Sequence, residues 1–226
     1  MLLRSVTFAT RWGLRTLAIG LGSLSTLLQS GNEEAWLVRA RAHGSFGQED
    51  DAVAVTRVGL RRLPESVKLR IDLADRLIFQ GKVEEARQVL TDLPPAARDS
   101  PGALSALAHA AWREGDFTSA RELSLEARRL LRQSSSDHDV EVLIGIASLL
   151  AEIPGAREDA LETLRMSVEA RPHEPWPHLI LAALLAEIDD AAAADHAEQA
   201  RACWSGGQKR FDSAMEMART RVRKAT

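Results

Sequence analysis

The sequence has one cysteine, no tyrosine, and an aromatic content of only 4%. Because a single cysteine, Cys203, cannot form a disulfide within the chain, the fold does not depend on an oxidising compartment. Cys203 precedes Trp204 and fits a small position between packed helices. We therefore expect packing, rather than covalent cross-links, to stabilise the chain.

The short motifs of common catalytic chemistry are also missing. The sequence has no phosphate-binding loop, no G-x-G-x-x-G between a strand and a helix, no H-E-x-x-H and no G-x-S-x-G. Potential metal ligands gather in residues 137–139 and 173–178, but neither group has a second matching cluster or helical spacing. We interpret both as solvated loops and predict a non-enzymatic chain without cofactor or metal.

Acidic residues are absent from residues 1–31, where Arg4, Arg11 and Arg15 are the only charged side chains. Their i, i+7, i+11 spacing predicts that they share one face of a helix. The run from Thr16 to Leu28 is almost wholly apolar, but its 13 residues fall short of the roughly 20 that a spanning helix needs. The beginning of the sequence therefore differs from the rest of it.

What the sequence does contain is a repeat. A glycine followed five residues later by an alanine recurs, and a fifth pair has aspartate in place of glycine: Gly47/Ala52, Gly81/Ala86, Gly115/Ala120, Gly155/Ala160 and Asp189/Ala194. Successive alanines are 34, 34, 40 and 34 residues apart, and the polar run at residues 133–139 accounts for the one longer step. This period predicts stacked helix pairs.

The period and its turn resemble the tetratricopeptide repeat (TPR) over roughly residues 32–205. In the first repeat the slots of that family are filled by Trp36, Ala40, Gly47, Ala52 and Pro64. The alanine slot requires a small side chain, because the two helices of a pair cross there at close range. The resemblance implies an all-α, right-handed superhelical solenoid of five antiparallel helix pairs.

In this family the first helix of each pair lines a concave groove. The positions that the resemblance assigns to the groove are Arg41, Lys68, Ile71, Asp75, Ile78, Phe79, His109, Trp112, Arg113, Leu149, Glu152 and Trp176. This mixed, rather apolar set favours an amphipathic helix or an extended peptide as the partner. It lacks the Lys/Asn pair with which some TPR domains hold carboxyl-terminal tails, since Leu37 and Arg41 stand there. Alternatively, Ile78, Phe79 and Trp112 pack between helices.

Three interpretations of residues 1–31 stay open. A step of 34 residues back from Gly47 and Ala52 reaches Gly13 and Ala18, so the segment fits a degenerate helix pair or cap preceding the first repeat. The three arginines, Arg4, Arg11 and Arg15, also fit a membrane-facing anchor that lies in the bilayer interface. A secretory signal has the same charge order, but no A-x-A-like cleavage site follows.

The chain closes with a predicted helix within residues 206–226. Its apolar stripe follows helical spacing and suits a cap over the last repeat: Phe211, Ala214, Met215, Ala218 and Val222. Residues 1–31 carry a net charge of +3 and residues 208–226 carry +4, which leaves −10 for the rest of a chain whose total is −3. An acidic body argues against nucleic acid as a partner, whereas the basic ends permit contact with anionic lipid or self-association.

Together these features predict a cytoplasmic, non-catalytic scaffold or assembly factor that binds a partner peptide or helix in its groove. The alternative is a structural subunit of a larger complex, peripheral to a membrane and docked through residues 1–28.

Overall fold

The structure is a computed structural model of the 226-residue chain and describes residues 2–11, 14–132, 137–186, 188–204 and 208–223. Within these ranges the chain forms fourteen helices and no strand. The helices are α1 (Leu2–Arg11), α2 (Arg15–Leu28), α3 (Glu33–Ser45), α4 (Glu49–Arg62), α5 (Val67–Phe79), α6 (Val83–Thr91), α7 (Pro95–Arg98), α8 (Pro101–Arg113), α9 (Phe117–Leu131), α10 (Asp137–Leu150), α11 (Arg157–Ala170), α12 (Pro175–Leu185), α13 (Asp190–Cys203) and α14 (Gln208–Arg223). The predicted all-α fold is confirmed.

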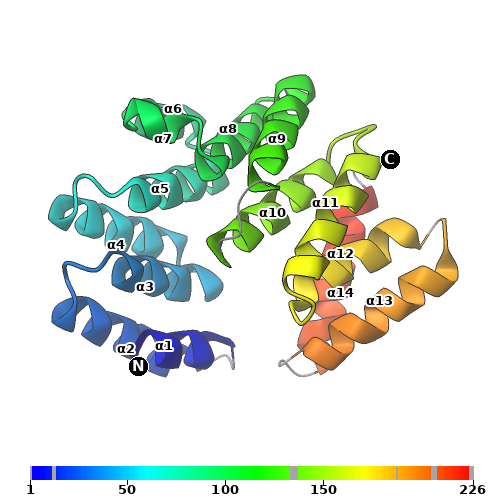
Figure 1. Cartoon of the computed structure of the whole chain (residues 1–226). Coiled ribbons are helices and arrows are strands. Elements are labelled where there is room, and N and C mark those ends of the chain that lie inside the picture. The colour runs from blue at the N-terminus through cyan, green and yellow to red at the C-terminus, as the bar shows by residue number, and fades with distance from the viewer. Residues whose placement is uncertain (1, 12–13, 133–136, 187, 205–207, 224–226) are drawn as a thin grey trace. The chain divides into compact units, whose positions relative to one another are not determined.

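The chain divides into two compact units, residues 1–98 (unit 1) and residues 99–226 (unit 2). In unit 1 the pairs α1/α2, α3/α4 and α5/α6 follow one another, and the second helix of each of the first two pairs packs against the first helix of the next (Figure 1). In unit 2 the pairs are α8/α9, α10/α11 and α12/α13, with α14 packed on α12. Each unit is therefore built from helix pairs in sequence order.

A glycine in a left-handed conformation turns the chain between the two helices of four pairs. The φ angles lie between 72° and 82° at Gly47, Gly81, Gly115 and Gly155. This region is costly for a residue with a Cβ atom. In the first three turns the amide after the glycine donates to the carbonyl five residues before it, at 2.8–3.1 Å. That bond satisfies a carbonyl that the helix end would otherwise leave unpaired.

One buried alanine marks the same point in the second helix of every pair. This alanine is the fourth residue after the N-cap of its helix, and its amide donates to the carbonyl of the N-cap residue. The six alanines are Ala18, Ala52, Ala86, Ala120, Ala160 and Ala193. The first five are fully buried and Ala193 is 8% exposed. A small side chain recurs where the two helices of a pair lie closest together.

The predicted position in the last pair, Ala194, is wrong by one residue. Ala194 is exposed, because Asp189 is the N-cap of α13 and does not take the place of the turn glycine. The Asp189 carboxylate accepts a hydrogen bond from the amide of Ala192 at 3.0 Å. An N-cap aspartate starts the helix at a defined residue, so the fourth residue after it is Ala193.

Two further segments of unit 2 differ in how well they match the expectation. The apolar stripe of α14, from Phe211 to Val222, is buried as predicted. The predicted polar loop at residues 133–139 is too long, because α10 already begins at Asp137; residues 133–136 lie outside the described residues.

Among the helices that the structure describes, none combines the length and apolar character needed to cross a bilayer.

Candidate partner-binding surface

The first helices of the pairs in unit 1 form one continuous surface, because α3 packs against both α1 and α5. We call the accessible side of α1, α3 and α5 the helix-A face. On α5 it carries Lys68, Ile71, Asp75 and Phe79, whose spacing places them along one side of the helix. Phe79 is 65% exposed, so this stripe contributes a large apolar side chain to the surface.

The predicted groove residue Arg41 lies in a pocket between α1 and α3. The pocket has a volume of about 240 Å³ and is lined by Thr7, Thr10, Val38, Arg41, Ala42 and Ser45. The hydroxyls of Thr7 and Thr10 donate to carbonyls of their own helix, at 3.1 and 2.9 Å. The threonines therefore turn methyl groups and acceptor oxygens to the pocket, and the guanidinium supplies its cationic donor.

Sequence reasoning missed the α1 side of this pocket, although the period contained the signal. Thr7, Arg41, Asp75 and His109 follow one another at 34-residue steps. The last three were assigned to the groove by the repeat, so the same step assigns Thr7 to the equivalent place on α1. The irregular composition of residues 1–31 concealed this fourth member.

The charges of the helix-A face in unit 1 are partly paired. Arg41 Nη2 is 3.1 Å from Glu34 Oε1, and Lys68 Nζ is 3.1 Å from Glu33 Oε1. Burial raises the pKa of Asp75, the neighbouring Asp72 carboxylate raises it further, and Arg76 opposes the rise. The side chain is nevertheless exposed to solvent, and with a pKa raised to about 7 it is charged in part of the molecules at neutral pH. The face therefore carries ionisable side chains of both signs together with the apolar Ile71 and Phe79.

In unit 2 the predicted residues are brought together only in part. On α8 the Arg113 guanidinium lies 5.3 Å from the centre of the Trp112 ring, a cation–π arrangement. His109 Nδ1 is 2.8 Å from the Ser105 carbonyl. Trp112 is half-buried and packs against the core of unit 2, as does Trp176 on α12. Glu152 follows the end of α10 and is half-buried. The tryptophans thus serve the core as well as the surface.

Two predicted groove residues are buried and cannot line an open surface. Ile78 and Leu149 are each 3% exposed. Ile78 stands at the edge of the α5 stripe, on the side turned into the helix packing. Leu149 lies in a helix that packs against α8, α9, α11 and α12, which leaves little of its circumference open. For Ile78 the alternative of packing between helices is correct, and for Leu149 the assignment to the groove is wrong.

The three arginines near the start of the sequence do not share one helix face. Arg4 lies exposed on α1, and Arg15 lies exposed in the first turn of α2. The chain ends α1 at Arg11 and starts α2 at Arg15, so the assumed continuous helix is broken. The side chain of Arg11 lies outside the described residues.

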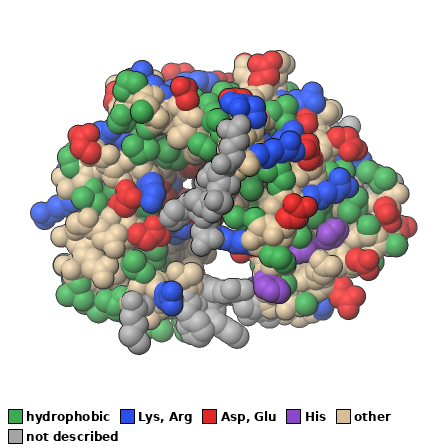
Figure 2. Space-filling model, viewed as in Figure 1, with side chains coloured by type: hydrophobic (Ala, Val, Ile, Leu, Met, Phe, Trp, Pro, Cys, Tyr) green, Lys and Arg blue, Asp and Glu red, His purple; other side chains and the backbone are tan. Residues whose placement is uncertain are grey.

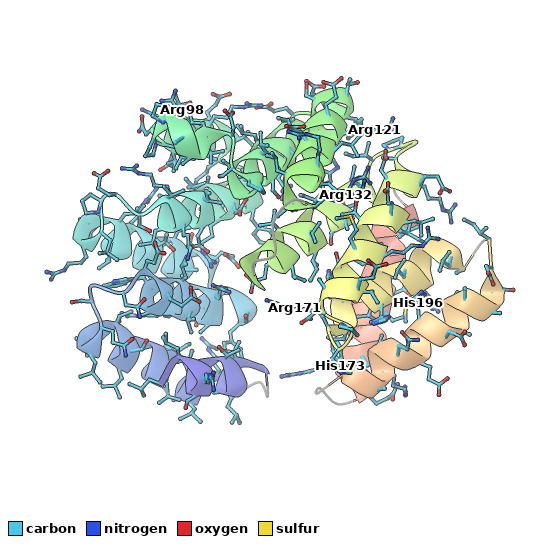
Figure 3. The ribbon with its side chains drawn as sticks, in the orientation of Figure 1. Arg98, Arg121, Arg132, Arg171, His173 and His196 are labelled. Atoms are coloured by element: carbon cyan, nitrogen blue, oxygen red, sulfur yellow. The ribbon has the colours of Figure 1, made fainter. Side chains whose placement is uncertain are left out.

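The second helices α9 and α11 of unit 2 present a different surface, which is rich in charges that pair with each other. In unit 2, Arg121 and Arg128 of α9 pair with Asp159 of α11, and Arg128 and Arg132 pair with Glu162 (Figure 3). These arginines are engaged within the fold. No group of three or more histidine, cysteine or acidic side chains in the described part of the chain could hold a metal ion. The helix-A face is thus the better candidate for a partner.

The comparisons agree with this architecture. Residues 45–110 match the sequence profile of the tetratricopeptide repeat, and no curated protein matches the sequence. Among solved structures, a tetratricopeptide repeat protein from Parabacteroides merdae is similar with a TM-score of 0.65 at 12% identity, covering 96% of this chain and 82% of that one.

Two further structures are similar over most of this chain. Yeast Tom70 gives a TM-score of 0.64 at 16% identity over 90% of this chain and 42% of its own. The APC/C hetero-tetramer Cut9–Hcn1 gives a TM-score of 0.62 at 14% identity, and the match covers 91% of this chain and 40% of that one. The chain therefore spans about two fifths of these two relatives. At these identities the similarity concerns the fold. Residues 45–110 thus resemble the tetratricopeptide repeat in sequence, and the chain as a whole has the all-α TPR fold.

Proposed function

We propose that this chain is a non-catalytic protein-interaction scaffold or assembly factor whose helix-A face binds a peptide or helix of a partner protein. TPR folds generally mediate protein–protein interactions, which supports this class of function. The observation that carries the proposal is Phe79. It is a large aromatic side chain, 65% exposed, at the C-terminal end of the predicted stripe on α5. Aromatic side chains at such positions tend to dominate binding energy.

The surroundings of Phe79 indicate the chemistry of the partner. Ile71 extends the apolar stripe along α5, while Asp75 and the Arg41 pocket contribute charges of opposite sign. A partner segment that packs an apolar side chain against Phe79 and places a basic group near Asp75 would use both kinds of contact. An amphipathic helix or an extended segment can supply that combination.

The experiment selects peptides from a displayed library on the full chain and measures their affinity for two variants, Phe79→Ala and Phe117→Ala. Phe117 is also exposed, at 42%, but it begins α9, a second helix, and so provides a matched control. We expect Phe79→Ala to weaken a selected peptide by about tenfold or more and Phe117→Ala to leave it unchanged. Equal affinities of the two variants would show that peptides do not bind the helix-A face of unit 1.

A second candidate function is attachment of the chain, as a structural subunit, to a membrane surface through residues 1–28. One observation favours it: α2 exposes several leucines in a segment that contains arginines and no acidic residue. Such a segment suits the interface of an anionic bilayer.

A further inference from the structure

The outward side of α2 is apolar. Leu17, Leu24, Leu27 and Leu28 are between 42% and 79% exposed, and their i, i+7, i+10, i+11 spacing puts them on one side of the helix. We call these four residues the leucine face. Figure 2 shows hydrophobic side chains at the lower left, where Figure 1 draws α2. The opposite side of α2, which includes Ala18, is buried against α1 and α3.

The other second helices show that the repeat itself does not require leucines here. Counted from the N-cap, the place of Leu17 is taken in other helices by Asp51, Glu85, Ser119, Asp159 and Ala192. The place of Leu27 is taken in α4, α9 and α11 by Arg61, Arg129 and Glu169. At these two places the other second helices therefore carry mostly charged or polar side chains. A stripe of four exposed leucines on the second helix of the first pair, α2, marks a docking surface.

The charge around the leucine face indicates what covers it. No acidic residue occurs before Glu33, and Glu33 and Glu34 are paired with Lys68 and Arg41. The segment therefore has an unbalanced positive field, which attracts an anionic bilayer by about 1 kcal/mol per cation close to the surface. A second protein of mixed surface charge gains little from such a field. The combination of leucines and cations selects an anionic lipid surface.

The length of α2 decides how it would meet the lipid. Its 14 residues rise about 21 Å at 1.5 Å per residue, which is less than the roughly 30 Å of the hydrocarbon core. The helix can lie along the interface but cannot cross it. We propose that α2 lies in the surface of an anionic bilayer, with the leucine face at the acyl boundary and with Arg4 and Arg15 adding long-range attraction to the headgroups.

This inference rests on the second candidate function and identifies its surface and its ligand. It is independent of peptide binding by the helix-A face. By helical spacing Arg15 stands on the side of α2 away from the leucines, at the first turn. Its contribution is therefore long-range attraction, which salt screens. The leucines should carry most of the binding.

The test is flotation of the full chain with vesicles of phosphatidylglycerol and phosphatidylcholine in equal parts, compared with phosphatidylcholine alone. We expect flotation with the anionic vesicles only. The triple variant Leu17→Gln, Leu24→Gln, Leu27→Gln should lower the partition coefficient by about a hundredfold or more. Arg4→Gln with Arg15→Gln should lower it by at most about fivefold per residue, and only at low salt. The matched control, Arg61→Gln with Arg129→Gln on the second helices α4 and α9, should change nothing.

Each contrary outcome has a separate meaning. If the unaltered chain does not float with anionic vesicles, both membrane attachment and the leucine face as its site are overturned. If the leucine variant floats as well as the unaltered chain, membrane attachment stands but its assignment to α2 is overturned. If the unaltered chain is a dimer that does not float and the leucine variant is a monomer, a second copy covers the leucine face and the lipid proposal is overturned. Circular dichroism establishes that each variant is folded.

Discussion

His178 and His196 face each other across α12 and α13 with their Nδ1 atoms 3.0 Å apart. The Nε2 atom of His178 is 3.0 Å from the carbonyl of Pro172. A carbonyl can only accept, so Nε2 of His178 carries the proton, and Nδ1 of the neutral ring accepts from Nδ1 of His196. This pair ties the two helices of the last repeat together.

The pair predicts a loss of stability in weak acid. Burial lowers the pKa of His196 below its ordinary 6.5, and repulsion by Arg165 and by the imidazolium form of His178 lowers it further, whereas Asp195 raises it. Between the lowered value and 6.5 the unfolded chain binds more protons than the folded one. The contribution of His196 to stability is therefore fully present above about pH 6.5. It is lost as the pH falls from there to the lowered pKa.

Urea unfolding of the full chain and of His196→Gln, from about pH 8 to about pH 5, checks this prediction. The glutamine amide can still donate to His178 but does not titrate. We expect the variant to lose less of its unfolding free energy on acidification than the unaltered chain. Equal losses in both proteins would show that His196 is not the responsible group.

The register of the last repeat can be tested with two adjacent alanines. Ala193→Leu forces a larger side chain between α12 and α13, and overpacking of this kind costs about 1–3 kcal/mol. Ala194→Leu adds the same atoms to an exposed position, where substitutions stay within about 0.5 kcal/mol. Thermal denaturation of both variants measures the difference. A larger loss for Ala194→Leu would restore the alignment predicted from the sequence.

Gly59 on α4 should not tolerate alanine. A Cβ atom there would lie 2.9 Å from Cγ of Trp36 and 3.2 Å from Cδ1 of Leu69, and the indole ring cannot bend away. We expect Gly59→Ala to destabilise unit 1 by about 1–3 kcal/mol, despite the better helix propensity of alanine. At Gly20 on α2 nothing lies within 4 Å of the added atom, so Gly20→Ala should stabilise by up to about 1 kcal/mol. Urea midpoints that shift in the same direction for both variants would contradict this account.

A polar cluster between α4 and α5 should contribute more than the surface ion pairs do. The Arg76 side chain is 10% exposed, its Nε donates to Asp72 Oδ2 at 2.8 Å, and its Nη1 lies 3.3 Å from Glu49 Oε2. Thr56 Oγ1 also donates to Asp72 Oδ2, at 2.8 Å. Asp72→Ala would leave the guanidinium poorly paired inside unit 1. We expect a loss of about 2–4 kcal/mol in unfolding free energy.

The control for Asp72→Ala is Glu85→Ala, which breaks the ion pair of Glu85 with Arg57. Both of those side chains are more than two fifths exposed, and such pairs are worth at most about 1 kcal/mol. Urea denaturation at low and high salt separates the cases, because salt screens only the exposed pair effectively. Similar losses for the two variants would mean that the cluster is no stronger than a surface pair.

Much of the fold was readable from local features of the sequence. The 34-residue period marked the turn glycines and the buried alanines from Ala52 to Ala160, and helical spacing marked the buried stripe of α14. The same period assigns Thr7 to a column with Arg41, Asp75 and His109. These features could be predicted because turn geometry and helix periodicity depend on residues close together in the chain.

Tertiary packing decided the rest. It buried Ile78 and Leu149, because neighbouring helices cover positions that spacing alone places on or beside an open stripe. It also made Ala193, not Ala194, the packed residue, because the Asp189 side chain sets the start of α13. The period placed Ala18 in the buried slot, but only the packed structure shows which side of α2 is left outward, and that side is leucine. The period of a repeat specifies where helices turn and nest, whereas the exposure of each face depends on which neighbours are present to cover it.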